Sequence, residues 1–181
     1  VNLGIMYGMG VAKLADQLGV DPDEAKGLLQ QHREMVPFVK ALAEMASRRA
    51  ANSGQIRTVL GRLCRFHLWE PTTFGAGKPL PHEEALKEYG GVNGMGIRRA
   101  FTYKALNRLI QGSAADQTKK AMLDCYSEGY TPMLTVHDEL CFNIDSPEQT
   151  ARIKEIMENG VQLKVPSKID VDIQDDWGEI E

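Results

Sequence analysis

Residues 131–144, TPMLTVHDELCFNI, constrain the fold of this chain more than any other stretch. Apolar residues recur with a period of two on both sides of His137 and Asp138, which predicts two antiparallel strands joined by a tight turn. One face of such a hairpin can be buried against helices, so the turn points toward solvent or a cleft. Asp138 followed by Glu139 on a rigid support could hold a divalent cation through carboxylate oxygens. The same residues also fit an ordinary polar turn.

The composition is that of a globular protein. The chain has 181 residues, 43% of them apolar and 25% charged, which is enough to bury a sizeable core. We see no membrane-span pattern and no signal-peptide pattern, and we expect a cytoplasm-like compartment. Three cysteines, without a CxxC pair, indicate reduced thiols and no zinc site. His67 and His82 stand at no metal-ligand spacing.

Charge is divided unevenly along the chain. From His137 to Glu181, twelve Asp or Glu residues stand against four Lys or Arg residues, and the rest of the chain carries the excess of basic residues. The basic residues gather in two groups, which are Lys40, Arg48, Arg49, Arg57, Arg62 and Arg65, and Arg98, Arg99, Lys104 and Arg108. These groups could be solvated helix faces, or a surface for a phosphate backbone that is separate from an acidic, metal-binding one.

Local patterns predict a mixture of helices and strands. Helices are expected over residues 11–18, 22–54, 97–128 and 148–160. Asp21 is the expected N-cap of the second helix, and Pro37 is expected to kink it. Residues 55–66 are prone to form strands, and KIDVDI at 168–173 alternates as a closing strand. Residues 67–96 are rich in Gly and Pro and are expected to form a long loop.

Two helical faces carry candidate binding residues. Leu3 and Tyr7 are four residues apart, so they share one face of a helix at the start of the chain. On the helix expected at 97–128, one side carries Lys104, Asn107, Arg108 and Gln111. That side could simply be hydrated, or its amides and cations could donate hydrogen bonds to a nucleic acid.

Three motifs follow one another along the chain: VNLGIMYG at 1–8, NRLIQGSAAD at 107–116 and VHDEL at 136–140. In order and spacing they resemble the carboxy-terminal part of the family A DNA polymerases, which include bacterial DNA polymerase I and several phage enzymes. TVLGR at 58–62 and LKVPSKIDVDIQDDWGE at 163–179 extend the resemblance over essentially the whole chain. The chain is therefore identified as similar to this family, and to its phage members in particular.

The resemblance implies an α+β fragment of the right-hand polymerase fold. Fingers helices would occupy residues 1–54, and a palm portion with an antiparallel sheet would occupy residues 55–181. The implied reaction adds dNTPs to the 3′ end of a DNA primer under the direction of a template. Primer-template DNA and dNTP are the implied partners, with no membrane, and a phage-encoded member would act in the host cytoplasm.

The resemblance also implies the metal site. In the family, the aspartate of the hairpin binds two catalytic Mg²⁺ ions, which assist phosphoryl transfer. That residue is Asp138 here, with Glu139 as its acidic neighbour. The family's other metal-binding aspartate lies upstream of Val1, so both ions would be shared with an upstream polymerase portion, on a separate chain or in a missing segment. The chain could be cropped, split or spliced.

The remaining site residues carry over by position. Leu3, Tyr7 and Gly8 lie on the helix that resembles the one closing over the incoming nucleotide, with Leu3 in place of the usual aromatic residue that senses the sugar. The implied DNA-binding residues are Arg62, Asn107, Gln111 and His137. The two amides match residues that face the minor groove, where every correct base pair presents acceptors. Arg62 resembles a phosphate-contacting arginine, and His137 positions the turn near the primer end.

Two other functions are open from the sequence. A non-catalytic DNA-binding subunit of a split polymerase would use the basic faces and leave Asp138 without a role. A metal-dependent phosphohydrolase of the His-Asp type would need further His and Asp ligands on helices, and the four histidines are not placed for it.

Overall fold

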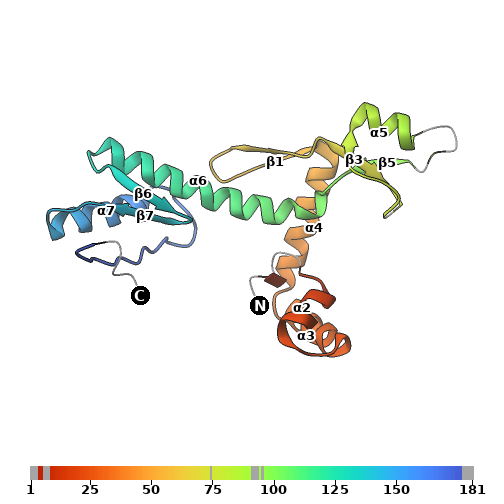
Figure 1. Ribbon diagram of the computed structural model, residues 1–181, viewed down its shortest axis with the longest axis horizontal. Coiled ribbons are helices and arrows are strands. Elements are labelled where there is room, and N and C mark those ends of the chain that lie inside the picture. The colour runs from red at the N-terminus through yellow and green to blue at the C-terminus, as the bar shows by residue number, and fades with distance from the viewer. Residues whose placement is uncertain (1–3, 6–8, 74, 91–93, 95, 177–181) are drawn as a thin grey trace. The chain divides into compact units, whose positions relative to one another are not determined.

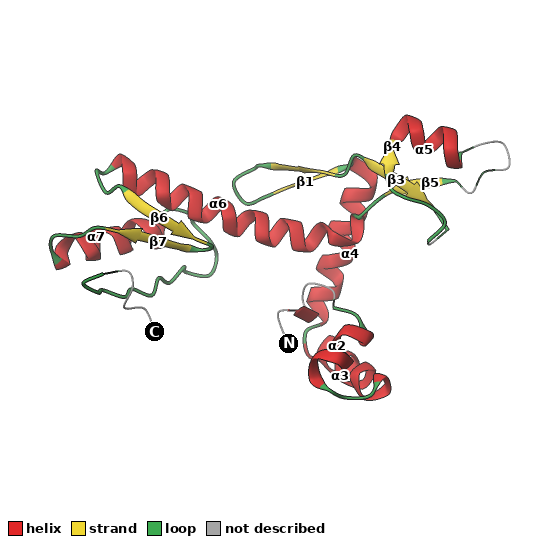
Figure 2. Ribbon diagram, in the orientation of Figure 1, coloured by secondary structure: helices red, strands yellow, loops and turns green. Residues whose placement is uncertain are grey.

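The computed structural model describes residues 4–5, 9–73, 75–90, 94 and 96–176. The chain divides into two compact units, Val1–Gly112 and Ser113–Glu181, and in each of them helices accompany small antiparallel sheets (Figures 1 and 2). The expected α+β class is confirmed. No helix within the described residues is long and apolar enough to cross a membrane. The assignment of fingers to residues 1–54 and palm to 55–181 stays a prediction.

The first unit begins with helices whose ends follow local chemistry. Helix α2 spans Val11–Leu18, and α3 spans Pro22–Met35. Asp21 caps α3 as predicted, because its Oδ1 accepts hydrogen bonds from the N–H groups of Asp23 at 2.8 Å and Glu24 at 2.9 Å. The two helices bury a small core of Leu14, Ala15, Ala25 and Leu29.

Pro37 separates α3 from the next helix, α4, which spans Pro37–Ser53. Proline has no N–H group and is well tolerated at the first position of a helix, so the predicted kink is a break at Val36. Helix α4 ends at Gly54, whose φ of 70° is in the left-handed region that favours glycine.

A hairpin follows, as the strand-forming sequence at 55–66 predicts. Strands β1 (Gln55–Arg57) and β2 (Leu63–Arg65) pair antiparallel, with Ile56 opposite Cys64. Ile56 and Phe66 are buried in the core of the first unit with residues of α4 and α6, which are Ala46, Ala50, Ala105 and Leu106. The hairpin is therefore anchored to two helices.

The prediction of a long loop over residues 67–96 is wrong, because this region contains strands and a helix. Strand β3 (Leu68–Pro71) lies between β4 (Leu80–Pro81) and β5 (Ile97–Arg99), and α5 spans His82–Tyr89. These elements are too short for a visible period, and the pairing of β3 with β5 joins segments that are distant in the sequence. Local patterns do not predict such pairings.

The long helix begins later than residue 97. Residues of β5 come first, then a 3₁₀ turn at Thr102–Lys104, and α6 spans Ala105–Ser127. Phe101 precedes the turn with a φ of 60°, a left-handed conformation that ends any helix running through it.

In the second unit, the predicted hairpin and the helix after it are confirmed. Strands β6 (Pro132–Val136) and β7 (Glu139–Phe142) pair antiparallel, and α7 spans Pro147–Asn159. Phe142 and Ile144 pack on a buried cluster of Cys125 from α6 and Ile153 and Ile156 from α7.

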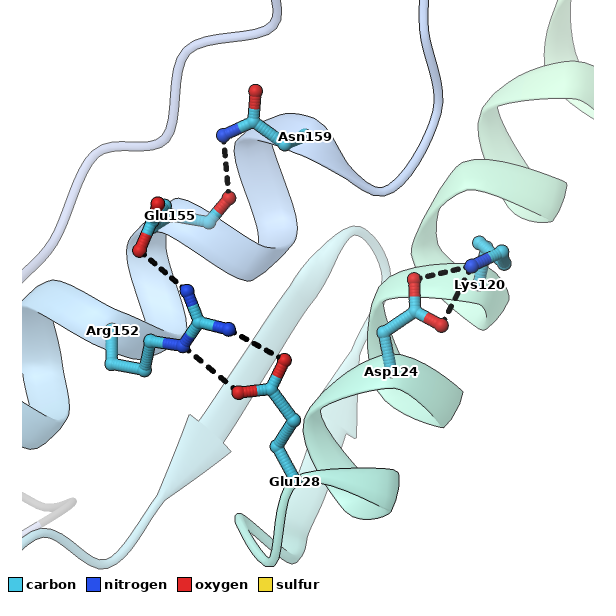
Figure 3. Close-up of polar contacts among 6 residues, drawn as sticks. All are labelled: Lys120, Asp124, Glu128, Arg152, Glu155 and Asn159. Carbon is cyan, nitrogen blue, oxygen red and sulfur yellow. Dashed lines mark hydrogen bonds and ion pairs between the residues drawn. The ribbon is translucent and has the colours of Figure 1, made fainter.

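An ion pair joins α7 to Glu128, the residue that follows α6 (Figure 3). The guanidinium of Arg152 donates to both carboxylate oxygens of Glu128 at 2.8 Å and to Glu155 at 2.6 Å. These hydrogen bonds raise the pKa of Arg152, with the bond to Glu128 as the largest cause. Nearby on α6, Lys120 pairs with Asp124 one turn further along the helix.

The prediction of a closing strand at residues 168–173 is also wrong. This segment follows α7 without regular secondary structure (Figure 2). A strand needs a hydrogen-bonding partner, and none of the described strands pairs with these residues.

Candidate functional site

The turn between β6 and β7 is short and conformationally constrained. Val136 lies opposite Glu139, so His137 and Asp138 alone connect the strands. His137 has a φ of 55°, which costs about 1–2 kcal/mol for a residue with a Cβ atom. The side chains of His137, Asp138 and Glu139 are all exposed. The turn and the first residue of β7 therefore present two consecutive carboxylates, Asp138 and Glu139, to solvent on a defined backbone.

The hairpin is supported from below by a buried cluster. Cys125 of α6 has no exposed surface and belongs to a buried cluster with Ile153 and Ile156 of α7. Burial raises the pKa of its thiol, and the charges of Asp124 and Glu128 raise it further. The thiol therefore behaves as a small apolar group and is not a reactive nucleophile. Its role in the cluster is to pack against the hairpin that carries the turn.

The donor set at the turn fits a Mg²⁺ ion but does not complete its coordination. Mg²⁺ prefers oxygen ligands and is held in many enzymes by one or two carboxylates together with substrate phosphates. Asp138 and Glu139 offer such carboxylates. Within the described residues, no group of three or more His, Cys, Asp or Glu side chains gathers to hold a metal.

A second set of candidate residues lies on α6. Asn107 and Gln111 are one helical turn apart, with Asn107 half-buried and Gln111 exposed. Neither amide side chain bonds to another described residue. Arg108, predicted on the same side, instead lies with its guanidinium 4.8 Å from the centre of the Phe66 ring. The two amides are thus available to a ligand, whereas Arg108 takes part in packing.

Arg62 is positioned by the β1–β2 hairpin. The N–H of Thr58 donates to the carbonyl of Arg62 at 3.0 Å, and the Thr58 hydroxyl accepts from the N–H of Arg62 at 3.0 Å. Gly61 completes the turn with a φ of 85°. The Arg62 Nη2 atom donates to the carbonyl of Gly112 at 2.8 Å, which brings this exposed side chain to α6 beside Gln111.

Thr58 and Gly112 were not predicted as site residues, although they hold this arrangement. A Cβ atom at Gly112 would lie 3.0 Å from Cγ2 of Thr58 and 3.5 Å from Nη2 of Arg62. The hairpin therefore approaches α6 so closely that a larger residue at position 112 would have to displace Thr58 by a few tenths of an ångström. A glycine in the middle of a helical pattern was the signal, because such a residue usually has a packing reason.

The structure brings the site residues together in two groups. Arg62, Asn107 and Gln111 belong to the first unit, and the turn at residues 137–139 belongs to the second. The nucleotide-binding candidates Leu3, Tyr7 and Gly8 lie outside the described residues. His82 packs against Trp69, with ring centres 4.7 Å apart.

The chain matches one protein family over almost all of its length. The family model described as DNA polymerase family A matches residues 1–179. Among curated proteins, the DNA-directed DNA polymerase of Pseudomonas phage M6 is 32% identical over 98% of this chain and 28% of the relative. The thermostable DNA polymerase I of Thermus aquaticus is 29% identical over 98% of this chain and 20% of the relative. The chain thus spans less than a third of these relatives.

A solved structure shows the same similarity. The polymerase domain of Pol1 from M. smegmatis, in complex with DNA primer-template and dNTP, matches with a TM-score of 0.67 and 29% identity. The match covers 91% of this chain and 27% of that one.

Proposed function

The chain belongs to DNA polymerase family A, and from this premise we propose that it is part of an enzyme that adds dNTPs to the 3′ end of a DNA primer on a template. The observation that carries the proposal is the exposed pair Asp138, on the two-residue turn, and Glu139, at the start of β7, within a chain that matches this family from residue 1 to 179. The phage M6 relative, named a DNA-directed DNA polymerase, supports the same activity.

In this proposal, Asp138 is the principal ligand for two Mg²⁺ ions, and Glu139 is its acidic neighbour. Bound ions activate the attacking 3′-hydroxyl and stabilise the charge on the leaving oxygen. The strands β6 and β7 hold the carboxylates at the turn, and His137 sets the direction of the turn and approaches the primer end. The missing ligands come from the upstream portion of the polymerase, so the chain requires that portion for activity.

The first unit would bind the primer-template. Asn107 and Gln111 donate hydrogen bonds to minor-groove acceptors, which occur in every correct base pair and therefore report its shape rather than its sequence. Arg62 binds a backbone phosphate and remains close to α6 through its hydrogen bond to Gly112. Leu3, Tyr7 and Gly8 contact the incoming nucleotide.

Primer extension tests the proposal. The chain is combined with the upstream portion of the phage M6 polymerase, and extension is measured with Mg²⁺ for the wild type and for Asp138→Asn. Loss of a metal-binding carboxylate removes several kcal/mol of transition-state stabilisation, so we expect the rate to fall about 100-fold or more.

Asp145→Asn is the matched control, because Asp145 is an exposed acidic residue of the same unit that lies beyond the hairpin. It should extend primers like the wild type. If Asp138→Asn extended primers as fast as this control, Asp138 would have no catalytic role. If the wild-type assembly bound primer-template DNA without extending it, the non-catalytic DNA-binding subunit would be favoured instead.

A further inference from the structure

Residues 89–115 contain cations but no acidic residue. The cations of this stretch are Arg98, Arg99, Lys104 and Arg108. An excess of positive charge in one stretch is typical of a surface that meets phosphate groups, unless other parts of the protein neutralise it. The contacts of each side chain therefore decide which of these cations is left for a ligand.

The three arginines of the stretch are engaged within the first unit. Arg98 forms an ion pair with Glu70. Arg99 donates hydrogen bonds to two backbone carbonyls. The guanidinium of Arg108 lies over the ring of Phe66. These contacts hold the three arginines within the packing of the unit.

Lys104 is the exception among these cations. It is exposed, and no described carboxylate forms an ion pair with its ammonium group. The ammonium nitrogen lies 5.1 Å from the centre of the Phe101 ring and 5.6 Å from the centre of the Tyr103 ring. Cation–π attraction to two rings restrains the position of the charge and leaves the charge itself intact. The side chain is thus a preorganised cation that faces solvent.

Lys104 lies on the same side of the helix as the two amides of the candidate site. It ends the 3₁₀ turn that leads directly into α6 at Ala105. Asn107 and Gln111 follow Lys104 by three and seven positions, a spacing that keeps side chains on one helical face. The opposite side is buried through Ala105 and Leu106. The cation therefore extends the row of amides by one turn.

We propose that Lys104 binds a backbone phosphate of the primer-template duplex, and that this contact sets how long the polymerase stays on DNA rather than which nucleotide it adds. The inference rests on the proposed function, in which Asn107 and Gln111 face the minor groove. A lysine ammonium is a compact charge that donates to phosphate oxygens. Because every nucleotide carries a phosphate, such a contact is independent of sequence.

The position of the phosphate follows from the helix. Seven residues at a rise of 1.5 Å separate positions 104 and 111 by about 10 Å along the axis. Each strand of a duplex rises by about 3.4 Å per nucleotide. With α6 lying along the groove, the phosphate is about three nucleotides away from the base pair that meets Gln111.

The salt dependence of DNA binding tests the contact. The chain is combined with the upstream portion of the phage M6 polymerase, and its affinity for labelled primer-template is measured by fluorescence anisotropy at several salt concentrations. One phosphate contact contributes about 0.9 to the slope of log affinity against log salt. Lys104→Gln should therefore reduce the slope by about 0.9 and weaken binding about eightfold at about 0.1 M salt. Lys104→Arg should keep the slope because it keeps the charge.

Two control variants separate a phosphate contact from other effects. Lys87 is an exposed lysine of α5 in the same unit, within one turn of Glu83 and Glu84. Lys87→Gln should therefore leave the slope at the wild-type value. Gln111→Ala should weaken binding without changing the slope, because an amide carries no charge.

Primer extension separates residence on DNA from chemistry. In the presence of a DNA trap, Lys104→Gln should make shorter products in one binding event than the wild type. At saturating DNA, its rate of single-nucleotide addition and its preference for the correct nucleotide should equal those of the wild type. A lower rate at saturating DNA, or a changed preference, would contradict the assigned role.

The outcomes distinguish this proposal from the proposed function. An unchanged salt slope in Lys104→Gln would overturn the phosphate contact, as would an equal fall in Lys87→Gln or a fall in Lys104→Arg. Failure of the proposed reaction has another signature, in which the wild-type assembly binds DNA but extends no primer, and the salt slope still reports on Lys104. Absence of DNA binding by the wild-type assembly would overturn both.

Discussion

Replacing Arg99 with alanine should destabilise the first unit far more than the same change at its neighbour Arg98. The Nε atom of Arg99 donates to the carbonyl of Ala51 at 3.1 Å, and its Nη1 atom donates to the carbonyl of Phe66 at 3.0 Å. The guanidinium carbon also lies 4.5 Å from the centre of the Trp69 ring. One side chain thus joins the end of α4, the segment after β2 and strand β3.

The magnitude follows from these contacts. Each hydrogen bond from a charged donor contributes about 1.5 kcal/mol at the low end of the usual range, and stacking on Trp69 adds about 0.5–1 kcal/mol. The free energy of unfolding should therefore fall by about 3.5–4 kcal/mol in Arg99→Ala. Arg98 forms an exposed ion pair with Glu70, so Arg98→Ala should cost about 0–1 kcal/mol.

Urea unfolding measures the difference. The chain has two tryptophans, so Trp69 fluorescence in a Trp177→Phe background follows the first unit. With a denaturant slope of about 2 kcal/mol per molar, the Arg99→Ala midpoint should lie about 2 M below the wild type. Arg99→Lys should recover little, because an ammonium cannot reach both carbonyls or stack as a guanidinium does. Equal midpoints for Arg99→Ala and Arg98→Ala would refute the reasoning.

Two other predictions concern the packing beside Arg62 and the start of α7. Gly112→Ala should weaken DNA binding by the assembled polymerase, because the new methyl group would press on Thr58 and displace Arg62. Fluorescence anisotropy with labelled primer-template measures the binding. The matched control is Gly27→Ala, which should leave binding unchanged because a Cβ atom at Gly27 meets nothing within 4 Å. Hydrogen bonds from the Ser146 hydroxyl and then from the backbone lower the pKa of Glu148 below 4.5. The stability that this carboxylate contributes is therefore present above pH 4.5 and lost as pH falls through the lowered value. In an NMR titration, Ser146→Ala should raise the pKa of Glu148 toward 4.5, and an unchanged value would contradict this cause.

Local chemistry explains what the sequence predicted correctly. Asp21 caps α3, Pro37 breaks the helix that contains it, and Gly54 ends α4, because each acts on backbone groups within a few residues. The hairpin around His137 was predicted for the same reason, since alternation and a two-residue turn are properties of adjacent residues. The family resemblance rests on this local order of motifs, and it is confirmed.

Tertiary structure decided the contacts between distant residues. The pairing of β3 with β5, and the contact of Arg62 with Gly112 across 50 positions, depend on packing that no local pattern contains. Residues 168–173 show the converse, because their alternation favours a strand while none of the described strands pairs with them. The sequence by itself determined the hairpin that carries Asp138 and Glu139. Only the tertiary structure showed that the β1–β2 hairpin, which carries Arg62, approaches α6 closely at Gly112. That approach depends on the absence of a side chain at the point where the two elements meet.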